Sequence, residues 1–241
     1  MTQRADLALV ARGLFESRAK AREAIEAGLV RVNGVVLTKP ATLLDEQAEV
    51  EARAPYPWVS RGGVKLAAAL HHFHINPQGR YCLDVGASTG GFTHVLLSGG
   101  AAHVVAVEVG HGQLHPSLQD DPRLTHYEHQ DARLLTPEHL KQPPSLIVCD
   151  ASFISLKIVL PPVLRLAAQP AQLIALIKPQ FEAGRSDTKK GIVRDAKVHQ
   201  QICVDMIGFF EALGWVARDI IASPITGGDG NQEFLMCADK S

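Results

Sequence analysis

From residue 81 onward the sequence alternates short apolar runs with stretches of helical periodicity. The runs YCLDVG, HVVAVEVG, SLIVCD and QLIALIK have the composition of strands, and WVARDII and EFLMCA follow the long helical stretch KVHQQICVDMIGFFEALG. Runs that are apolar throughout are typical of strands in a sheet covered on both faces. We therefore predict an α/β fold, with a doubly wound, mostly parallel sheet, for residues 61–241.

Charged residues stand where two of these runs stop. Lys178 ends QLIALIK and is followed by Pro179, which cannot continue the strand pairing, and Asp150 ends SLIVCD. Ligands bind at the carboxyl ends of the strands in open α/β sheets, so both side chains are expected at one functional edge. A lysine that only extends from the sheet to the solvent is the alternative interpretation of Lys178.

A glycine-rich turn, DVGASTGGF, follows the first predicted strand. Gly86 and Gly90 would let the backbone approach a ligand closely, and the helix after the turn offers free N–H donors. The spacing does not fit the G-x-G-x-x-G pattern of dinucleotide sites. Glu108, at the end of the next strand, stands where a ribose-binding carboxylate belongs.

This turn resembles the first motif of S-adenosylmethionine-dependent methyltransferases. The resemblance implies that the turn holds the methionine end of the cofactor, that Glu108 binds the ribose and that Asp131, after the third strand, lies by the adenine. Asp131 in that loop could equally be a helix cap. The implied cofactor-binding residues are Asp84, Gly86, Ala87, Ser88, Gly90, Gly91, Phe92, Glu108 and Asp131.

The first 53 residues have a different pattern and precede a proline-containing linker at 54–60. Leu7, Val10 and Leu14 predict one helix, and Ser17 is a plausible N-cap for a second, RAKAREAIEAG, which ends at Gly28. The pair Asn33-Gly34 between β-branched runs predicts a hairpin. A segment this short buries little surface, which favours a small α+β binding module.

The segment RADLALVARGLFESRAKAREAIEAGLVRVNGVVLTKPATLL resembles the RNA-binding domain of ribosomal protein S-four. A basic helix face and the hairpin grip structured RNA in that family. Charge alone would leave a solvated helix face as the simpler interpretation. The implied RNA-binding residues of this segment are Arg4, Arg12, Arg18, Lys20, Arg22 and Arg31.

Lys65 in SRGGVKL and Glu233 in GNQEFL complete, with Asp150 and Lys178, the K-D-K-E set of FtsJ-type 2′-O-ribose methyltransferases. With DVGASTGGF, DASFISL, IKPQFEAGR and KGIVRD in the same order, the chain resembles the TlyA/hemolysin A family. The resemblance implies methylation of a ribose in ribosomal RNA, at a cytidine and more in the large subunit. A 2′-hydroxyl must lose its proton as it attacks, so we assign Lys178 as the base, with the other three positioning it and the ribose.

The loop EAGRSDTKKGIVRD carries Arg185, Lys189 and Lys190, and we interpret it as a basic lid that meets phosphates, with an ordinary exposed loop as the alternative. The net charge of −1 and the pI near 6.8 give no global basic field, so RNA contacts must be local. Partners are expected to be ribosomal RNA or ribosomal subunits.

Several other function classes have weaker support. The histidine-rich HHFH lacks a metal-binding pattern, so no metal is expected, and the scattered cysteines are typical of reduced, buried thiols. The start lacks an apolar signal region and no run is long enough to span a bilayer, so we expect a cytoplasmic location. A membrane-active hemolysin and a non-catalytic RNA-binding assembly factor are the two rival functions.

Overall fold

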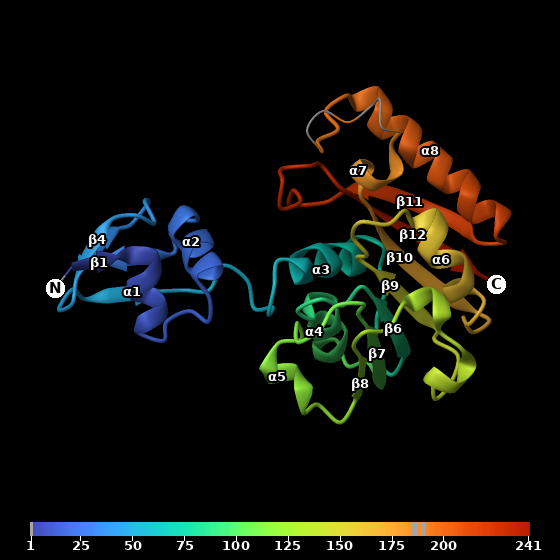
Figure 1. The fold of residues 1–241 in the computed structure, drawn as a ribbon, viewed down its shortest axis with the longest axis horizontal. Coiled ribbons are helices and arrows are strands. Elements are labelled where there is room, and N and C mark those ends of the chain that lie inside the picture. The colour runs from blue at the N-terminus through green and yellow to red at the C-terminus, as the bar shows by residue number, and fades with distance from the viewer. Residues whose placement is uncertain (1, 185–187, 189–190) are drawn as a thin grey trace. The chain divides into compact units, whose positions relative to one another are not determined.

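The computed structural model describes residues 2–184, 188 and 191–241 (Figure 1). The chain divides into two compact units, Met1–Pro57 and Trp58–Ser241, and the division lies inside the predicted linker. We call them unit 1 and unit 2 and describe each by itself.

Unit 1 combines two helices with two small sheets. Ser17 caps the second helix by accepting a hydrogen bond from the Lys20 N–H at 3.2 Å, as predicted. Asn33 and Gly34 have φ of 50° and 78°, so the predicted hairpin has the left-handed turn that Asn-Gly favours. The helices are α1 (Ala5–Ala11) and α2 (Arg18–Glu26). The two sheets have the strand orders β1-β4 and β3-β2-β5, with β1 (Thr2–Arg4), β2 (Val30–Val32), β3 (Val35–Val36), β4 (Leu43–Asp45) and β5 (Val50–Ala52).

The first helix is shorter than the apolar pattern predicted, and its buried face is different. Leu7 and Leu14 are 38% and 41% exposed, whereas Ala5, Ala8 and Leu9 are buried. Gly13, with φ of 70°, ends the helical path, so Leu14 lies outside α1. Small alanines on the inner face let α1 pack closely against α2.

A buried carboxylate links the start of α1 to α2. Asp6 is fully buried and accepts hydrogen bonds from Arg4 Nη2 at 3.0 Å and from Arg18 Nε at 2.8 Å. The Arg4 hydrogen bond, together with Arg18, holds the pKa of Asp6 far below its usual range. Arg12 donates to the backbone carbonyls of residues 45, 46 and 48. Three residues predicted to bind RNA therefore make contacts inside unit 1.

We expect Asp6→Asn to loosen α1 and α2, because two guanidinium groups lose the anion that they surround. Amide hydrogen exchange on the full chain should show protection in both helices falling by about tenfold or more, with unit 2 unchanged. Glu26→Gln is the matched control, since Glu26 meets Arg22 only at 3.8 Å on the surface. Unchanged protection in Asp6→Asn would show that the buried cluster does not hold the two helices.

Unit 2 contains one seven-stranded sheet with the order β11-β12-β10-β9-β6-β7-β8. In the described part of the chain, β12 runs opposite in direction to the other strands of this sheet, because it is antiparallel to both β10 and β11. The predicted mostly parallel sheet is confirmed. The strands are β6 (Tyr81–Val85), β7 (His103–Val107), β8 (Leu124–Tyr127), β9 (Leu146–Cys149), β10 (Ala171–Ile177), β11 (Val216–Ala222) and β12 (Phe234–Lys240).

Helices cover both faces of this sheet, as the doubly wound prediction requires (Figure 1). Side chains of α3 (Gly62–His72), α4 (Gly91–Ser98) and α5 (Pro116–Gln119) join the core on one face. Those of α6 (Leu156–Leu164) and α8 (Ala196–Ala212) join the core on the other. The remaining short elements are η1 (Ala132–Leu134), η2 (Pro137–His139) and α7 (Pro179–Glu182).

The burial of β10 on both faces of the sheet explains its continuous apolar sequence. Leu173, Ala175 and Ile177 face one core, while Ile174 and Leu176 face the other. Because β12 is antiparallel, its first residue, Phe234, pairs with Ile177 at the end of β10. The residues that follow β10 and precede β12 are thereby brought to the same edge of the sheet.

Candidate active site

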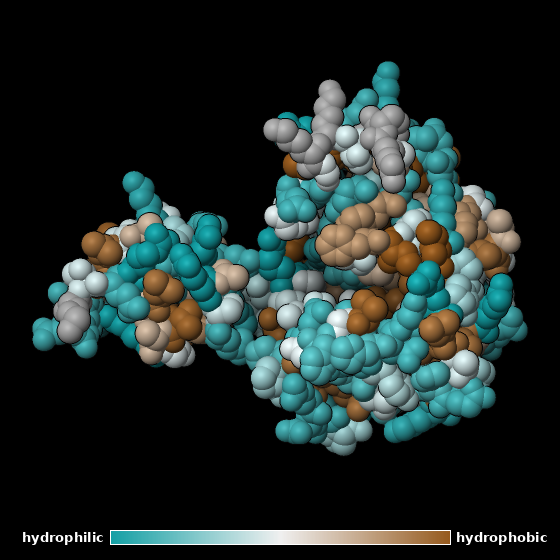
Figure 2. Space-filling view, in the orientation of Figure 1, coloured by the Kyte–Doolittle hydropathy of each residue, from teal (hydrophilic) through white to brown (hydrophobic). Residues whose placement is uncertain are grey.

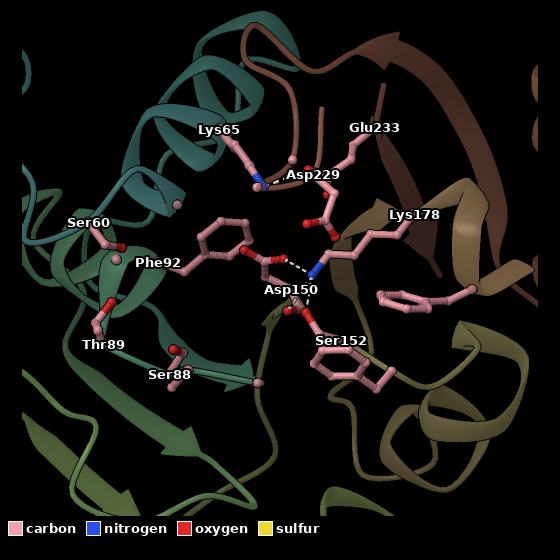
Figure 3. Close-up of a pocket in the computed structure, with 18 of the residues that line it drawn as sticks. Ser60, Lys65, Ser88, Thr89, Phe92, Asp150, Ser152, Lys178, Asp229 and Glu233 are labelled. Atoms are coloured by element: carbon pink, nitrogen blue, oxygen red, sulfur yellow. Dashed lines mark hydrogen bonds and ion pairs between the residues drawn. The ribbon is translucent and has the colours of Figure 1, made fainter. Parts of the chain in front are cut away.

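Two adjoining cavities open at the carboxyl edge of the parallel strands. The first, of about 300 Å³, contains Lys65 and Lys178 and is called the lysine cavity (Figure 3). The second, of about 460 Å³, is called the Glu108 cavity. Figure 2 shows a hollow in this face of unit 2 with apolar side chains around it. Both cavities share the wall formed by Gly86, Ser88, Asp150, Ser152 and Phe153.

The four residues of the K-D-K-E set all line the lysine cavity. Lys65, from α3, forms an ion pair with Glu233 at 2.6 Å. Lys178, at the end of β10, forms an ion pair with Asp150 at 2.6 Å, and β9 and β10 are neighbours in the sheet. Lys178 also donates to the Asp150 carbonyl at 3.1 Å and to Ser152 Oγ at 2.6 Å.

Each of these lysines is buried beside a carboxylate of opposite charge. Lys65 is 8% exposed, Lys178 is 7% exposed and Glu233 is 3% exposed. A charge removed from water this far is tolerated only when it is paired and hydrogen-bonded. The cavity therefore presents amino groups in fixed positions, held by acids at the end of β9 and before β12.

The turn after β6 lines both cavities, and its residues Gly86 and Gly90 have left-handed backbones. Gly86 has φ of 80°, and a Cβ there would lie 2.9 Å from the Ala151 Cα. Gly86 therefore leaves room for the loop after β9, and it also lines both cavities, so its predicted role beside a ligand stays a prediction. Gly91, Ala87 and Phe92 line the lysine cavity. Gly90 lies beside Leu114 and Leu118, where a Cβ would clash.

Glu108 closes the other side of the Glu108 cavity and fixes the turn. Its Oε2 accepts a hydrogen bond from the Ser88 N–H at 2.9 Å, and its Oε1 accepts from the Gly110 N–H at 2.8 Å. Asp131 lines the same cavity, caps η1 and forms an ion pair with Arg133 at 2.6 Å. Asp131 is thus a helix cap, and its position beside the adenine of a cofactor stays a prediction.

Asp84 lies beneath the glycine turn and is fully buried. Its Oδ2 accepts a hydrogen bond from Thr93 Oγ1 at 2.6 Å, which links β6 to α4. Burial raises the pKa of Asp84 to about 7, the nearby charges of Asp150 and Glu108 add to the rise, and the Thr93 bond opposes it. Asp84 therefore supports the turn from below.

Sequence reasoning missed several side chains at the lysine cavity. Ser152, Phe153 and Phe181 all line it, and the two phenylalanine rings lie 5.3 Å apart. Phe153 is 90% exposed and has φ of 64°, an unusual backbone for a bulky residue. Ser152 and Phe153 lie two and three residues after Asp150 in the motif DASF. Their closeness to Asp150 in the sequence could have identified them as site residues.

Hydrogen bonds to Glu182 connect the segment that follows Lys178 with the segment that follows Asp150. Its carboxylate accepts hydrogen bonds from Ser155 Oγ at 2.5 Å and from the Leu156 N–H at 2.7 Å. Glu182 belongs to α7, which follows Lys178, whereas Ser155 caps α6, which follows the Asp150 loop. Both loops are thereby held at the cavity.

The other residues and features predicted from the sequence lie outside the two cavities or outside the described residues. Lys20 and Arg22 form ion pairs with Glu16 and Glu26 on the surface of α2, and Arg31 donates to the Gly34 carbonyl. Within the ranges given above, there is no cluster of histidine, cysteine or acidic side chains that could hold a metal ion. None of the helices described here is long and apolar enough to cross a membrane. The predicted lid residues Arg185, Lys189 and Lys190 lie outside the described residues.

The sheet order, the glycine turn after β6 and the acid after β7 define a Rossmann-like methyltransferase fold. Residues 58–240 match the FtsJ-like methyltransferase family, and residues 3–50 match the S4 domain. The chain belongs to the FtsJ-like methyltransferase family, and its N-terminal segment is an S4 domain.

Named relatives cover most of the chain. It is 45% identical to the 16S/23S rRNA (cytidine-2′-O)-methyltransferase TlyA of Mycobacterium tuberculosis, over 97% of this chain and 88% of the relative. It is 37% identical to the 23S rRNA (cytidine-2′-O)-methyltransferase TlyA of Campylobacter jejuni, over 74% of this chain and 69% of the relative. A solved structure of a candidate hemolysin from Streptococcus thermophilus matches with a TM-score of 0.79 and 38% identity, covering 100% of this chain and 89% of the other.

Protonated Asp84 contributes stability that is fully present below its ordinary pKa of 3.8 and is lost as pH rises through about 7. Asparagine cannot ionise. The free energy of unfolding of Asp84→Asn, relative to that of the wild type, should therefore rise by on the order of 2 kcal/mol between pH 5 and pH 8. Urea unfolding followed by tryptophan fluorescence measures this in unit 2, which contains both Trp58 and Trp215.

Asp120→Asn, at an exposed position, is the control for simple removal of a carboxylate. A stability difference between Asp84→Asn and wild type that stays constant over this pH range would contradict the assignment.

Proposed function

We propose that this protein transfers a methyl group from S-adenosylmethionine to a ribose 2′-hydroxyl of ribosomal RNA in the cytoplasm. The acceptor would be a cytidine, more in the large subunit than in the small one. The observation that carries the proposal is the shared wall of the two cavities, where Asp150 stands between the buried amino group of Lys178 and the Glu108 cavity. The names of the two TlyA relatives support the same reaction and the same nucleoside.

The Glu108 cavity fits the adenosine part of the cofactor. Val107, Ile154 and Val159 supply apolar lining, and the carboxylates of Glu108 and Asp131 supply acceptors for hydroxyl and amino groups. The turn from Gly86 to Gly91 would hold the methionine part beside the lysine cavity. S-adenosylmethionine supplies an electrophilic methyl group when it is bound.

The side chains of the lysine cavity would prepare the acceptor. Lys178 would take the proton from the 2′-hydroxyl in the state in which its amino group is neutral, because only the neutral amine has a lone pair that can accept a proton. Asp150 holds Lys178 by its 2.6 Å ion pair. The Lys65–Glu233 pair lines the same cavity, where it would orient the ribose by hydrogen bonds.

The aromatic pair, in which Phe153 is exposed and Phe181 is half-buried, suits an unstacked nucleotide. A 2′-hydroxyl within a stacked helix is poorly placed for in-line attack, so the target nucleotide has to be turned out toward the cavity. Phe153 and Phe181, which line the same cavity as Lys178, provide flat apolar surfaces on which a base could stack.

The reaction can be tested by mapping ribose methylation in ribosomal RNA and subunits prepared from cells that lack this gene. Wild-type protein with S-adenosylmethionine should methylate one or a few defined cytidines. RNA that is bound but unmethylated would favour the non-catalytic assembly factor. Dye release from liposomes, without methylation, would favour the membrane-active hemolysin.

Lys178→Ala should lower methyl transfer by about 100-fold or more and leave cofactor affinity nearly unchanged, because the lysine acts on the acceptor. Lys178→Arg should fail as well, since a guanidinium does not give up its proton. Single-turnover assays and calorimetry with S-adenosylhomocysteine measure the two properties separately. Transfer by Lys178→Arg at the wild-type rate would remove Lys178 from the role of base.

Unit 1 would bind RNA through the exposed part of α2, where the side chain of Arg22 is 54% exposed. Arg22→Glu should weaken RNA binding, and the slope of log affinity against log salt concentration should fall by about one for each phosphate group that is no longer neutralised. Arg165→Glu, at the exposed end of α6, is the matched control. Filter binding over a range of salt concentrations measures both, and equal weakening in the two variants would refute a specific role for α2.

A further inference from the structure

The hydroxyl of Ser152, like the carboxylate of Asp150, contacts Lys178 and lines both cavities. Ser152 lines the lysine cavity and the Glu108 cavity, and its Oγ lies 2.6 Å from Lys178 Nζ (Figure 3). Ser152 is an exposed residue, whereas Lys178 is 7% exposed. A substrate in the cleft therefore meets Ser152 more readily than it meets the amino nitrogen.

The three oxygen partners of Lys178 differ in what they can do. The Asp150 carboxylate at 2.6 Å and the Asp150 carbonyl at 3.1 Å can only accept hydrogen bonds. Ser152 Oγ can accept a hydrogen bond from an ammonium group or donate one to an amine. When Lys178 is neutral, its lone pair is therefore best satisfied by the Ser152 hydroxyl.

We propose that Ser152 is a catalytic proton relay that passes the proton of the ribose 2′-hydroxyl to Lys178; this rests on the proposed function. The 2′-hydroxyl donates its hydrogen bond to Ser152 Oγ, and the Ser152 hydroxyl donates to Lys178 Nζ. The amine keeps its hydrogen bond to the Asp150 carbonyl and its 2.6 Å contact with the Asp150 carboxylate throughout. Ser152 thus lets a buried base act on a substrate that stays in the open part of the cleft.

The methyl group and two hydrogens then move in one reaction step. The 2′-oxygen forms a bond to the methyl carbon of the sulfonium donor as the carbon–sulfur bond breaks and its electron pair stays on sulfur. The hydrogen of the 2′-hydroxyl moves to Ser152 Oγ, and the original serine hydrogen moves to Lys178 Nζ. The products are a methyl ether, a thioether, an unchanged serine and an ammonium group.

Single-turnover methyl transfer to the mapped cytidine tests the relay. Ser152→Ala should slow transfer by about 100-fold with cofactor affinity unchanged. Ser152→Thr, which keeps the hydroxyl, should recover most of the rate. Ser98→Ala, at the exposed end of α4, is the matched control and should behave as wild type.

Mixtures of H₂O and D₂O add a measurement that a purely structural role would not change. Two protons in motion predict a curved dependence of the rate on deuterium fraction for the wild type. A straight line is expected for the slow reaction of Ser152→Ala, in which a single transfer remains.

Binding provides a test that does not depend on turnover. A synthetic RNA hairpin with the mapped cytidine should bind the wild type about fivefold more tightly than the same hairpin with a 2′-deoxy nucleotide there. The difference should disappear in Ser152→Ala, since the acceptor of that hydrogen bond is gone.

The outcomes separate this proposal from the proposed function. Wild-type rates in Ser152→Ala, or a straight deuterium dependence in the wild type, would overturn the relay and leave Lys178 as the direct base. If the wild type methylates no RNA, the proposed function fails and the relay fails with it. If Ser152→Thr is as slow as Ser152→Ala, the hydroxyl is not what the reaction needs, and the relay is overturned.

Discussion

The pairing of β10 with β9 on one side and β12 on the other is the constraint on which the site depends. β10 is parallel to β9 and antiparallel to β12, so the end of one strand, the end of the second and the start of the third meet at one edge. Lys178, Asp150 and Glu233 stand at those three points.

This edge also sets the electrostatics of the site. Lys178 and Lys65 are each buried against one carboxylate, and the two pairs line the same cavity. Paired in this way, the amino groups can be kept out of bulk water at a tolerable cost in free energy. The adjoining Glu108 cavity shares a wall with this arrangement, so the sites proposed for the methyl donor and the ribose lie next to each other.

Much of this could be predicted from local sequence, and the remainder depends on contacts that local sequence does not contain. The apolar run before Lys178, the Ser17 cap and the Asn33-Gly34 hairpin each follow from residues that are adjacent in the chain. The partnership of Arg4 and Arg18 with Asp6 could not be predicted, because the burial of Asp6 depends on how α1 and α2 pack. The tight fit of Gly86 against Ala151 and the contact of Ser152 with Lys178 likewise arise only when β6, β9 and β10 lie side by side.

We expect the methyl donor and the base to meet at the wall shared by the two cavities. A crystal structure of the protein with S-adenosylhomocysteine tests it most directly. We expect the adenosine part to bind in the Glu108 cavity, near Glu108. The sulfur should lie at the shared wall beside Asp150 and face Lys178. A cofactor bound elsewhere, or a sulfur directed away from the lysine cavity, would contradict it.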